Sequence, residues 1–354
     1  MRRLNLRGTL AALLLTMGAA GAGAQELPTA SPESVGMSSE GLAKINEVMR
    51  RHIEAGTIVN AVTLVVRRGK IVHYEAHGVL DVAAGTPMRK DAIFRMASSS
   101  KPITAVGVLA LVEDGKLRLS DPVSKFIPEF ADMKVATPKP GAAPLAPLAP
   151  GSGAPTGPKP EADRVPAARP ITIRDLLTHT SGLMSGGLGN RLATIEQGPA
   201  EALAAVIPRY GAVALDFQPG TRWSYSAGAG FDTLGRIIEI VSGKRLDVYL
   251  RERIFVPLQM ADVAFVVSPD RKARMNSLYR KNPQGQWAAS PPPPAFASEV
   301  YFSGAGGLVG TARDYARFEQ MLLNGGKLNG KRILSKRSVE MMRTDQIPGL
   351  FHGM

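Results

Sequence analysis

The stretch Phe94–Gly115, FRMASSSKPITAVGVLALVEDG, determines how the rest of the chain is interpreted. Apolar residues recur at helical spacing after Pro102, and the final glycine is a typical stop signal. Proline is tolerated at this early position because the first N–H groups of a helix have no partner within it. We therefore expect a helix whose first turn contains Ser98 and Lys101.

This turn carries the pattern Ser-x-x-Lys. Residues three apart share one face of a helix, so the Ser98 hydroxyl and the Lys101 amine would lie side by side at the positive end of the helix dipole. A serine hydroxyl is a weak nucleophile and needs an adjacent base, a role that a buried lysine can fill. The pattern also arises by chance, and taken alone a helix-capping Ser98 followed by a solvated lysine is the commoner arrangement.

Bulk composition indicates an ordinary globular protein. The 354 residues are 44% hydrophobic and 21% charged, and after the N-terminus no apolar run approaches the ~20 residues of a membrane span. The chain has no cysteine, which excludes a thiol nucleophile, thiolate metal sites and disulfides. Lysines and arginines give a net charge of +13 but are scattered singly, so we expect no nucleic-acid groove.

Residues 1–24 have the pattern of a secretory signal peptide. Three arginines precede an apolar centre at Leu10–Met17, and small residues follow at Ala22–Ala24. An uncleaved anchor is the alternative. We expect a periplasmic or secreted protein after cleavage near Ala24, with residues 25–354 forming a single domain.

A Pro-, Ala- and Gly-rich segment at 138–170 interrupts that domain. Such a composition cannot bury enough apolar surface to offset the entropy of ordering, so we predict a disordered insert. A linker between two domains is the alternative.

The segment before the Ser-x-x-Lys helix predicts a helix at 38–53 and an antiparallel hairpin at 61–78. His73 and His77 share one face of its second strand, so a metal pair is one interpretation. No third ligand is nearby, so two surface histidines are the better interpretation. We expect no metal and no organic cofactor.

Two further segments contain polar residues in suggestive positions. The sequence ITIRDLLTHTSGL at 171–183 predicts a short helix followed by a turn that contains His179. In WSYSAGAGFDTLGRIIEIVSG at 223–243, Tyr225 precedes an amphipathic helix, where a side chain can point into a cleft. A packed tyrosine with a bonded hydroxyl is the alternative for Tyr225.

Together, SSSKPIT, LLTHTSGL, the Tyr-Ser-Ala run and AGGLVGTARDYARF resemble the serine β-lactamase and penicillin-binding-protein-like family. Class C β-lactamases and family VIII carboxylesterases are the most similar branches, and the resemblance covers about residues 30–345. It implies an α/β (α+β) fold in which helices flank an antiparallel sheet, an all-helical lobe is inserted, and the site lies between the two lobes.

The resemblance also implies acyl transfer through a covalent serine. Ser98 would attack a carbonyl carbon, Lys101 would accept its proton, and Tyr225 would share the base role and protonate the leaving group. The Ser98 N–H would be one oxyanion donor. A Ser-His-Asp triad with His179 is rejected because the sequence has no G-x-S-x-G elbow, so we expect His179 to be a turn histidine that bonds backbone.

Two departures from the family pattern matter. Ala227 stands where many members carry an asparagine, which favours esters over β-lactams. The third motif, a Lys, His or Trp followed by a small residue and Gly, is expected after the last helix, and His352–Gly353 lacks its spacing. The chain is therefore expected to be C-terminally truncated, and loss of one oxyanion donor costs on the order of 10²–10³ in rate.

The sequence thus predicts an exported serine hydrolase that forms an acyl-enzyme on Ser98 and hydrolyses carboxylic esters. One alternative is a β-lactamase or a D-amino-acid peptidase or carboxypeptidase. Another is a truncated, non-catalytic relative that binds cell-envelope ligands. The expected partner is a small-molecule ester or β-lactam, and nothing in the sequence indicates an oligomeric state.

Overall fold

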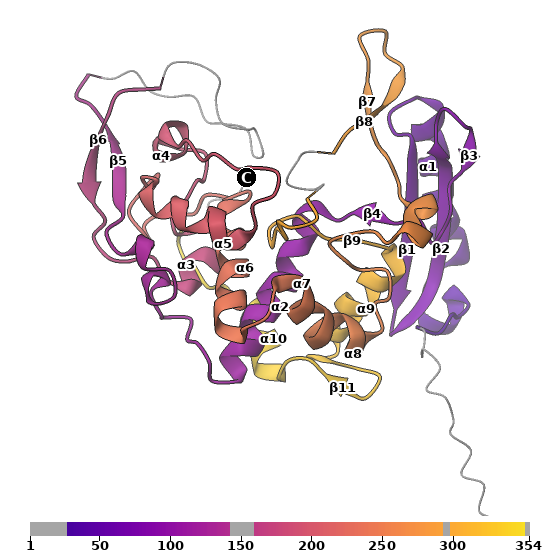
Figure 1. Ribbon diagram of the computed structural model, residues 1–354. Helices are drawn as coiled ribbons and strands as arrows, with labels where there is room; N and C mark the ends of the chain where they lie inside the picture. The colour runs from indigo at the N-terminus through magenta and orange to yellow at the C-terminus, as the bar shows by residue number, and fades with distance from the viewer. Residues whose placement is uncertain (1–26, 142–158, 293–297, 351–354) are drawn as a thin grey trace, which may run out of the picture.

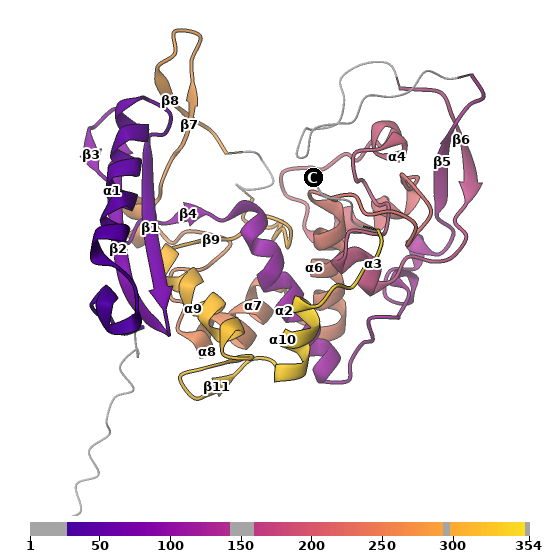
Figure 2. The same ribbon diagram turned by 180° about the vertical axis from the view of Figure 1, so that it is seen from behind.

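The structure is a computed structural model that describes residues 27–141, 159–292 and 298–350. A central helix, α2 (Ser100–Glu113), lies between a lobe containing the main sheet and a lobe built mostly of helices (Figure 1). The same arrangement is seen from behind, with α10 (Lys336–Arg343) crossing near α2 (Figure 2). The expected two-lobe architecture, with an antiparallel sheet flanked by helices, is confirmed.

The sheet lobe is built from the N-terminal segment. Its elements are α1 (Ser39–Glu54), β1 (Asn60–Arg67), β2 (Lys70–Asp81) and β3 (Thr86–Pro87). β1 and β2 are antiparallel, and a two-residue turn joins them. Both turn residues, Arg68 and Gly69, have positive φ, as a tight hairpin requires. The helix at 38–53 and the hairpin at 61–78 are confirmed to within a few residues.

The helical lobe follows α2 in the sequence. It contains α3 (Ile173–Leu177), α4 (Leu188–Leu192), α5 (Leu203–Val206) and α6 (Ala229–Ser242). α6 ends at Gly243, whose φ is +69°, the left-handed conformation typical of a helix stop.

The remaining elements follow α6 in the sequence. They are α7 (Leu246–Leu250), a π-helical turn (Arg251–Phe255), α8 (Val256–Leu258), β7 (Leu278–Lys281), β8 (Trp287–Ser290), β9 (Val309–Gly310), α9 (Ala312–Leu323), β10 (Lys327–Leu328), β11 (Lys331–Arg332) and α10. β9 pairs with β4 (Phe94–Arg95), so the segment that leads into α2 is joined to a late part of the chain.

The core is centred on α2, which is apolar around most of its circumference. Its buried residues include Ile103, Val106, Val108 and Leu111, each with no exposed surface. A helix that is apolar all round must be covered on every side. Gly107 shows how close the cover is, because an added Cβ there would lie 2.9 Å from a methyl carbon of Leu250.

The first turn of α2 differs from the expectation. Ser98 belongs to a 3-10 turn, Ala97–Ser99, and the α-helix begins at Ser100. The tighter turn still places Ser98 one turn before the helix body, so the face shared with Lys101 is kept.

The predicted disordered insert at 138–170 is wrong at its two ends, where the structure has strand residues. β5 (Lys134–Pro138) pairs in register with β6 (Ala162–Pro166), from Lys134 opposite Pro166 to Pro138 opposite Ala162. Backbone hydrogen bonds between these two strands order the ends of a segment whose composition alone suggested no structure. Residues 142–158 lie outside the described part of the chain, as do residues 1–24 with the predicted signal peptide. None of the helices in the described ranges combines the length and apolar character needed to span a bilayer.

Candidate active site

Ser98 lies in an exposed 3-10 turn at the start of α2. Neighbouring residues fix this turn, since the Met96 N–H donates to the Leu308 carbonyl at 2.9 Å and the Leu308 N–H donates to Ser100 Oγ at 3.2 Å. Ala97 has a φ of +45°, a strained value for a residue with a side chain. The turn therefore presents Ser98 at the surface while the residues on either side are anchored.

Lys101 is 6% exposed and its ammonium is fully partnered. Nζ lies 3.3 Å from Ser98 Oγ and donates to the carbonyl oxygens of Ala227 at 2.7 Å and Ala305 at 2.9 Å. A lysine ammonium has three N–H donors, so these three acceptors use all of them. The two carbonyls come from different loops, and together they aim Nζ at the serine.

Tyr225 completes the group. Its hydroxyl donates to Ser98 Oγ at 2.7 Å, and the Lys101 Nζ lies 5.0 Å from the centroid of its ring. The three residues singled out in the sequence, from two segments more than a hundred residues apart, therefore meet at one oxygen atom. Ala227 contributes its backbone carbonyl where the family pattern offers a side-chain amide.

His179 contacts the Tyr225 ring and the backbone of the next residue, Ser226. Its φ is +59°, its Nδ1 accepts from the Ser226 N–H at 3.2 Å, and its ring lies 4.7 Å from that of Tyr225. Burial, with a further contribution from the charge of Lys101, lowers its pKa from 6.5 to about 4, so the imidazole is neutral at physiological pH. The prediction that the His179 side chain bonds backbone is confirmed, but the backbone belongs to Ser226, 47 residues further along the chain, and not to the turn that contains His179.

Sequence reasoning missed a buried carboxylate close to these residues. Asp232, in the first turn of α6, is 5% exposed and accepts from Tyr301 Oη at 2.8 Å, Ser303 Oγ at 2.7 Å and the Ala305 N–H at 3.0 Å. A charged residue among apolar ones on the inward face of the predicted helix was the available signal.

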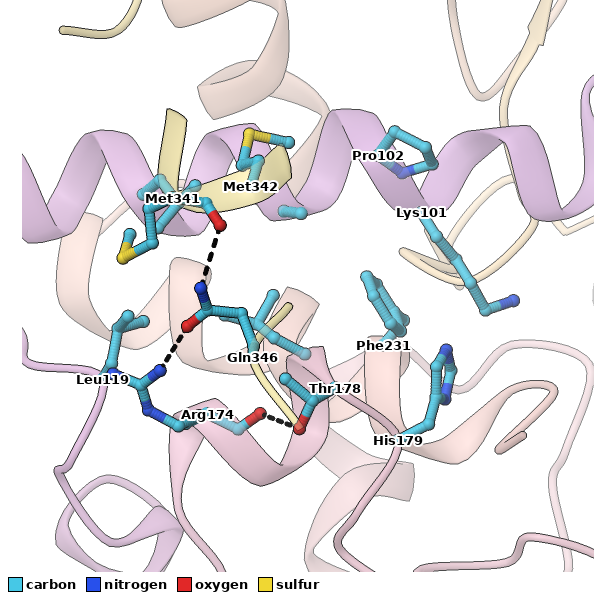
Figure 3. Close-up of a pocket in the computed structure, with 13 residues that line it drawn as sticks. Lys101, Pro102, Leu119, Arg174, Thr178, His179, Phe231, Met341, Met342 and Gln346 are labelled. Carbon is cyan, nitrogen blue, oxygen red and sulfur yellow. Dashed lines mark hydrogen bonds between the residues drawn. The ribbon is translucent and has the colours of Figure 1, made fainter. Parts of the chain in front are cut away.

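A pocket of about 340 Å³ is lined by Lys101 together with His179 and Phe231 (Figure 3). Pro102 and the α2 side chains behind it form one wall, and Met341 and Met342 of α10 form another. Its polar rim includes a hydrogen bond of 2.6 Å from Arg174 Nη1 to Gln346 Oε1. The site thus has a mostly apolar hollow beside its buried lysine.

His73 and His77 are not the two surface histidines that we expected, because His73 is 8% exposed and His77 is half-buried. The Nε2 atoms of both lie against the hydroxyl of Thr63, at 2.7 Å and 3.0 Å. Within residues 27–141, 159–292 and 298–350, no three His, Cys, Asp or Glu side chains gather in a way that could hold a metal ion.

The two-lobe fold is the β-lactamase/transpeptidase-like fold, and the class of protein it defines here is a serine hydrolase. Comparison with known proteins leads to the same class. The Beta-lactamase family model matches residues 45–353, and the chain belongs to that family.

Curated relatives are identical to this chain at about a third of the aligned positions. Protein Rv1367c of Mycobacterium tuberculosis (strain ATCC 25618 / H37Rv) is 37% identical over 313 residues, which is 84% of this chain and 71% of the relative. Esterase EstB of Burkholderia gladioli is 32% identical over 310 residues, which is 81% of this chain and 71% of the relative. Such identities over this length place the chain in one family with these proteins.

Solved structures agree on the fold. EstCE1, described as a hydrolase with promiscuous acyltransferase activity, superposes with a TM-score of 0.65 at 25% identity, covering 86% of this chain and 77% of EstCE1. Unliganded simvastatin synthase (LovD) from Aspergillus terreus gives a TM-score of 0.67 at 24% identity, covering 88% of this chain and 74% of LovD.

Proposed function

We propose that this protein forms a covalent acyl-enzyme on Ser98 and hydrolyses carboxylic esters. The observation that carries the proposal is the position of Ser98 Oγ, which lies 2.7 Å from Tyr225 Oη and 3.3 Å from Lys101 Nζ. A nucleophilic oxygen with two potential proton acceptors at these distances meets the geometric requirement for activation.

The chemistry follows from these contacts. Ser98 Oγ attacks the ester carbonyl carbon while its proton passes to the Lys101 and Tyr225 pair. The tetrahedral intermediate then collapses, and Tyr225 returns a proton to the departing alcohol. A water molecule, deprotonated by the same pair, attacks the acyl carbon, releases the carboxylic acid and restores the serine.

Stabilisation of the oxyanion is assigned to the N-terminal end of α2. Ser98 lies in the turn that opens the helix, where the first backbone N–H groups have no partner within the helix. The positive end of the helix dipole favours the negative charge that develops on the substrate oxygen.

Esters are favoured over β-lactams by the residue beside the lysine. Ala227 offers its carbonyl to Lys101 but has no side-chain amide to bind the amide group of a β-lactam. Relatives named for ester hydrolysis point the same way, with Esterase EstB at 32% identity and Lovastatin esterase of Penicillium rubens (strain ATCC 28089 / DSM 1075 / NRRL 1951 / Wisconsin 54-1255) also at 32%.

The proposed place of action is the periplasm or the exterior of the cell. The arginines, short apolar centre and small residues of positions 1–24 support export with cleavage near Ala24. Intact mass of the protein recovered from an export-competent host tests this, because cleavage would give a chain starting at Gln25.

The enzymatic proposal is tested with Ser98→Ala beside Ser99→Ala, its neighbour in the same turn. We expect wild type and Ser99→Ala to hydrolyse a short-chain aryl ester and, with a fluorophosphonate, to gain the mass of one phosphonyl group, which is the reagent less the HF that leaves. Ser98→Ala should do neither, and Tyr225→Phe should lose about 10²–10⁴-fold in rate. Hydrolysis that survives in Ser98→Ala would refute the assignment, and faster turnover of a chromogenic cephalosporin than of the ester would refute the substrate class.

A further inference from the structure

Asp232 is a buried charge whose position the ester chemistry does not explain by itself. Removing a carboxylate from water is costly unless it is well hydrogen-bonded, and such groups contribute little to net stability. Here three donors surround the carboxylate, and all three come from the short segment Tyr301–Ala305. A costly group that binds one loop so completely indicates a role in fixing that loop.

The loop matters because it carries one of the acceptors of Lys101. Asp232 Oδ1 accepts from both Ser303 Oγ and the Ala305 N–H. The carbonyl of the same residue, Ala305, accepts from Lys101 Nζ at 2.9 Å. Ala305 therefore links the two side chains. Its N–H donates to the Asp232 carboxylate, and its carbonyl accepts from Lys101 Nζ.

The second acceptor of Lys101 lies just before the helix that carries Asp232. Ala227 precedes α6 by two residues, and the Asp232 N–H donates to the Gly228 carbonyl at 3.1 Å. Asp232 is thus attached by its side chain to one carbonyl-bearing loop and by its backbone to the turn that bears the other.

Two fixed carbonyls have a specific consequence for a lysine that acts as a base. A neutral amine has two N–H groups and one lone pair. If Ala227 and Ala305 accept the two N–H groups, the lone pair is left facing Ser98 Oγ. Displacement of either carbonyl would let the amine rotate away from the serine.

We infer that Asp232 is the positioning residue of this site, holding the 301–305 loop so that the Ala305 carbonyl directs Lys101 toward Ser98. The inference rests on the proposed role of Lys101 and adds a residue that never touches substrate. It also accounts for Gly304, where an added Cβ would lie 2.7 Å from the Phe231 carbonyl oxygen, because the loop must pass directly against α6.

The surroundings keep the donors of this network in place. Burial, with the negative charge of Asp232, raises the pKa of both Tyr301 and Tyr210 well above that of an ordinary phenol. Both hydroxyls therefore remain protonated over the working pH range, and Tyr301 Oη remains a donor to Oδ2. Burial also raises the pKa of the Asp232 carboxyl above its ordinary value, although its three hydrogen-bond donors act in the opposite direction.

The test compares Asp232→Ala with Asp232→Asn. Alanine removes all three acceptor contacts, and we expect kcat to fall roughly 10²-fold with little change in KM, as for a misplaced catalytic group. Asparagine keeps an Oδ1 that can accept from Ser303 and Ala305, so it should recover most of the lost kcat. An Asp232→Asn variant as slow as Asp232→Ala would overturn the inference, because hydrogen bonding to the loop would not be what matters.

Asp314→Asn is the matched control, since Asp314 is also a buried carboxyl but lies in α9 and bonds the Asp262 N–H. Asp314→Asn should change the free energy of unfolding without changing kcat. A crystal structure of Asp232→Ala gives a readout that needs no activity: we expect the Lys101 Nζ to Ala305 O distance to exceed its present 2.9 Å. An unchanged distance overturns the inference, whereas absence of Ser98-dependent turnover in wild type refutes only the proposed function.

Discussion

A histidine that stays neutral inside the site makes the folded state sensitive to acid. The pKa of His179 is about 4 in the folded protein, and its ordinary value is 6.5. Between these two pH values the imidazole is therefore protonated in the unfolded chain but neutral in the folded one. The stability contribution is complete above pH 6.5 and is lost as the pH falls to about 4. Its upper bound is about 3 kcal/mol, and urea unfolding between pH 7.5 and 4 measures it.

His179→Asn isolates that contribution from the rest of the titration. Asparagine tolerates the positive φ at this position and offers an oxygen to the Ser226 N–H. We expect the wild type to lose stability relative to this variant as the pH falls from 6.5 to 4. Parallel pH profiles for the two proteins would show that His179 titrates normally.

At the residue scale, motif spacing was sufficient to single out Ser98, Lys101 and Tyr225, whose side chains meet in the structure. The pattern Ser-x-x-Lys is local, and a tyrosine before an amphipathic helix belongs to a recognisable segment. Asp232 could not be found in this way, because two of its partners, Tyr301 and Ser303, lie 69 and 71 residues further along the chain. A buried carboxylate is explained only by the donors that surround it, and those are set by tertiary structure.

At the element scale, α3 is held by an unusually complete N-terminal cap. Thr172 Oγ1 accepts from the Asp175 N–H, and Asp175 in turn accepts from the Thr172 N–H and hydroxyl and from Arg169. Burial alone would raise the pKa of Asp175, but these hydrogen bonds outweigh it and the pKa lies below the ordinary value.

Thr172→Ala should therefore destabilise the protein by about 1–2 kcal/mol, the upper part of the range for a lost cap, because Asp175 also loses a donor. Ser38→Ala is the comparison, since Ser38 caps α1 through a single bond to the exposed Gly41 N–H. Chemical denaturation of both variants measures the difference. A loss for Thr172→Ala no greater than that for Ser38→Ala would mean that the shared carboxylate adds nothing.

Periodicity predicted the elements best where the local pattern was strong. α1, the β1–β2 hairpin and α6 all lie within a few residues of the predicted ranges. β5 and β6 were missed because Pro and Ala predict no regular structure by themselves. Their ladder depends on a partner strand across an intervening segment, which no single-strand pattern reveals.

At the scale of the whole molecule, the β5–β6 ladder lies at the outer end of the helical lobe, away from α2 (Figure 1). Lys139 and Glu161 form an ion pair of 2.9 Å just beyond the last paired residues. Replacing residues 140–160 with Asn-Gly would close the ladder as a two-residue hairpin. Ester hydrolysis should stay within about twofold, and the shorter loop should stabilise the fold by about 1–2 kcal/mol.

Steady-state kinetics and thermal unfolding of that deletion variant measure both effects, with wild type as the reference. A loss of hydrolysis greater than about tenfold would show that the segment contributes to the site rather than only extending the surface.

The partners of Lys101 also bear on the stage of folding at which the proposed active site is assembled. Its two carbonyl acceptors lie 126 and 204 residues further along the chain. Contacts of such separation form late, because closing long loops is slow compared with winding a helix. If Lys101 is the base that we propose, a partly folded chain that holds α2 and Ser98 still has no oriented base. Recovered turnover is therefore expected to be a stricter reporter of complete folding than helix content, because in the proposed mechanism Ser98 has no oriented base until the last long-range contacts have formed.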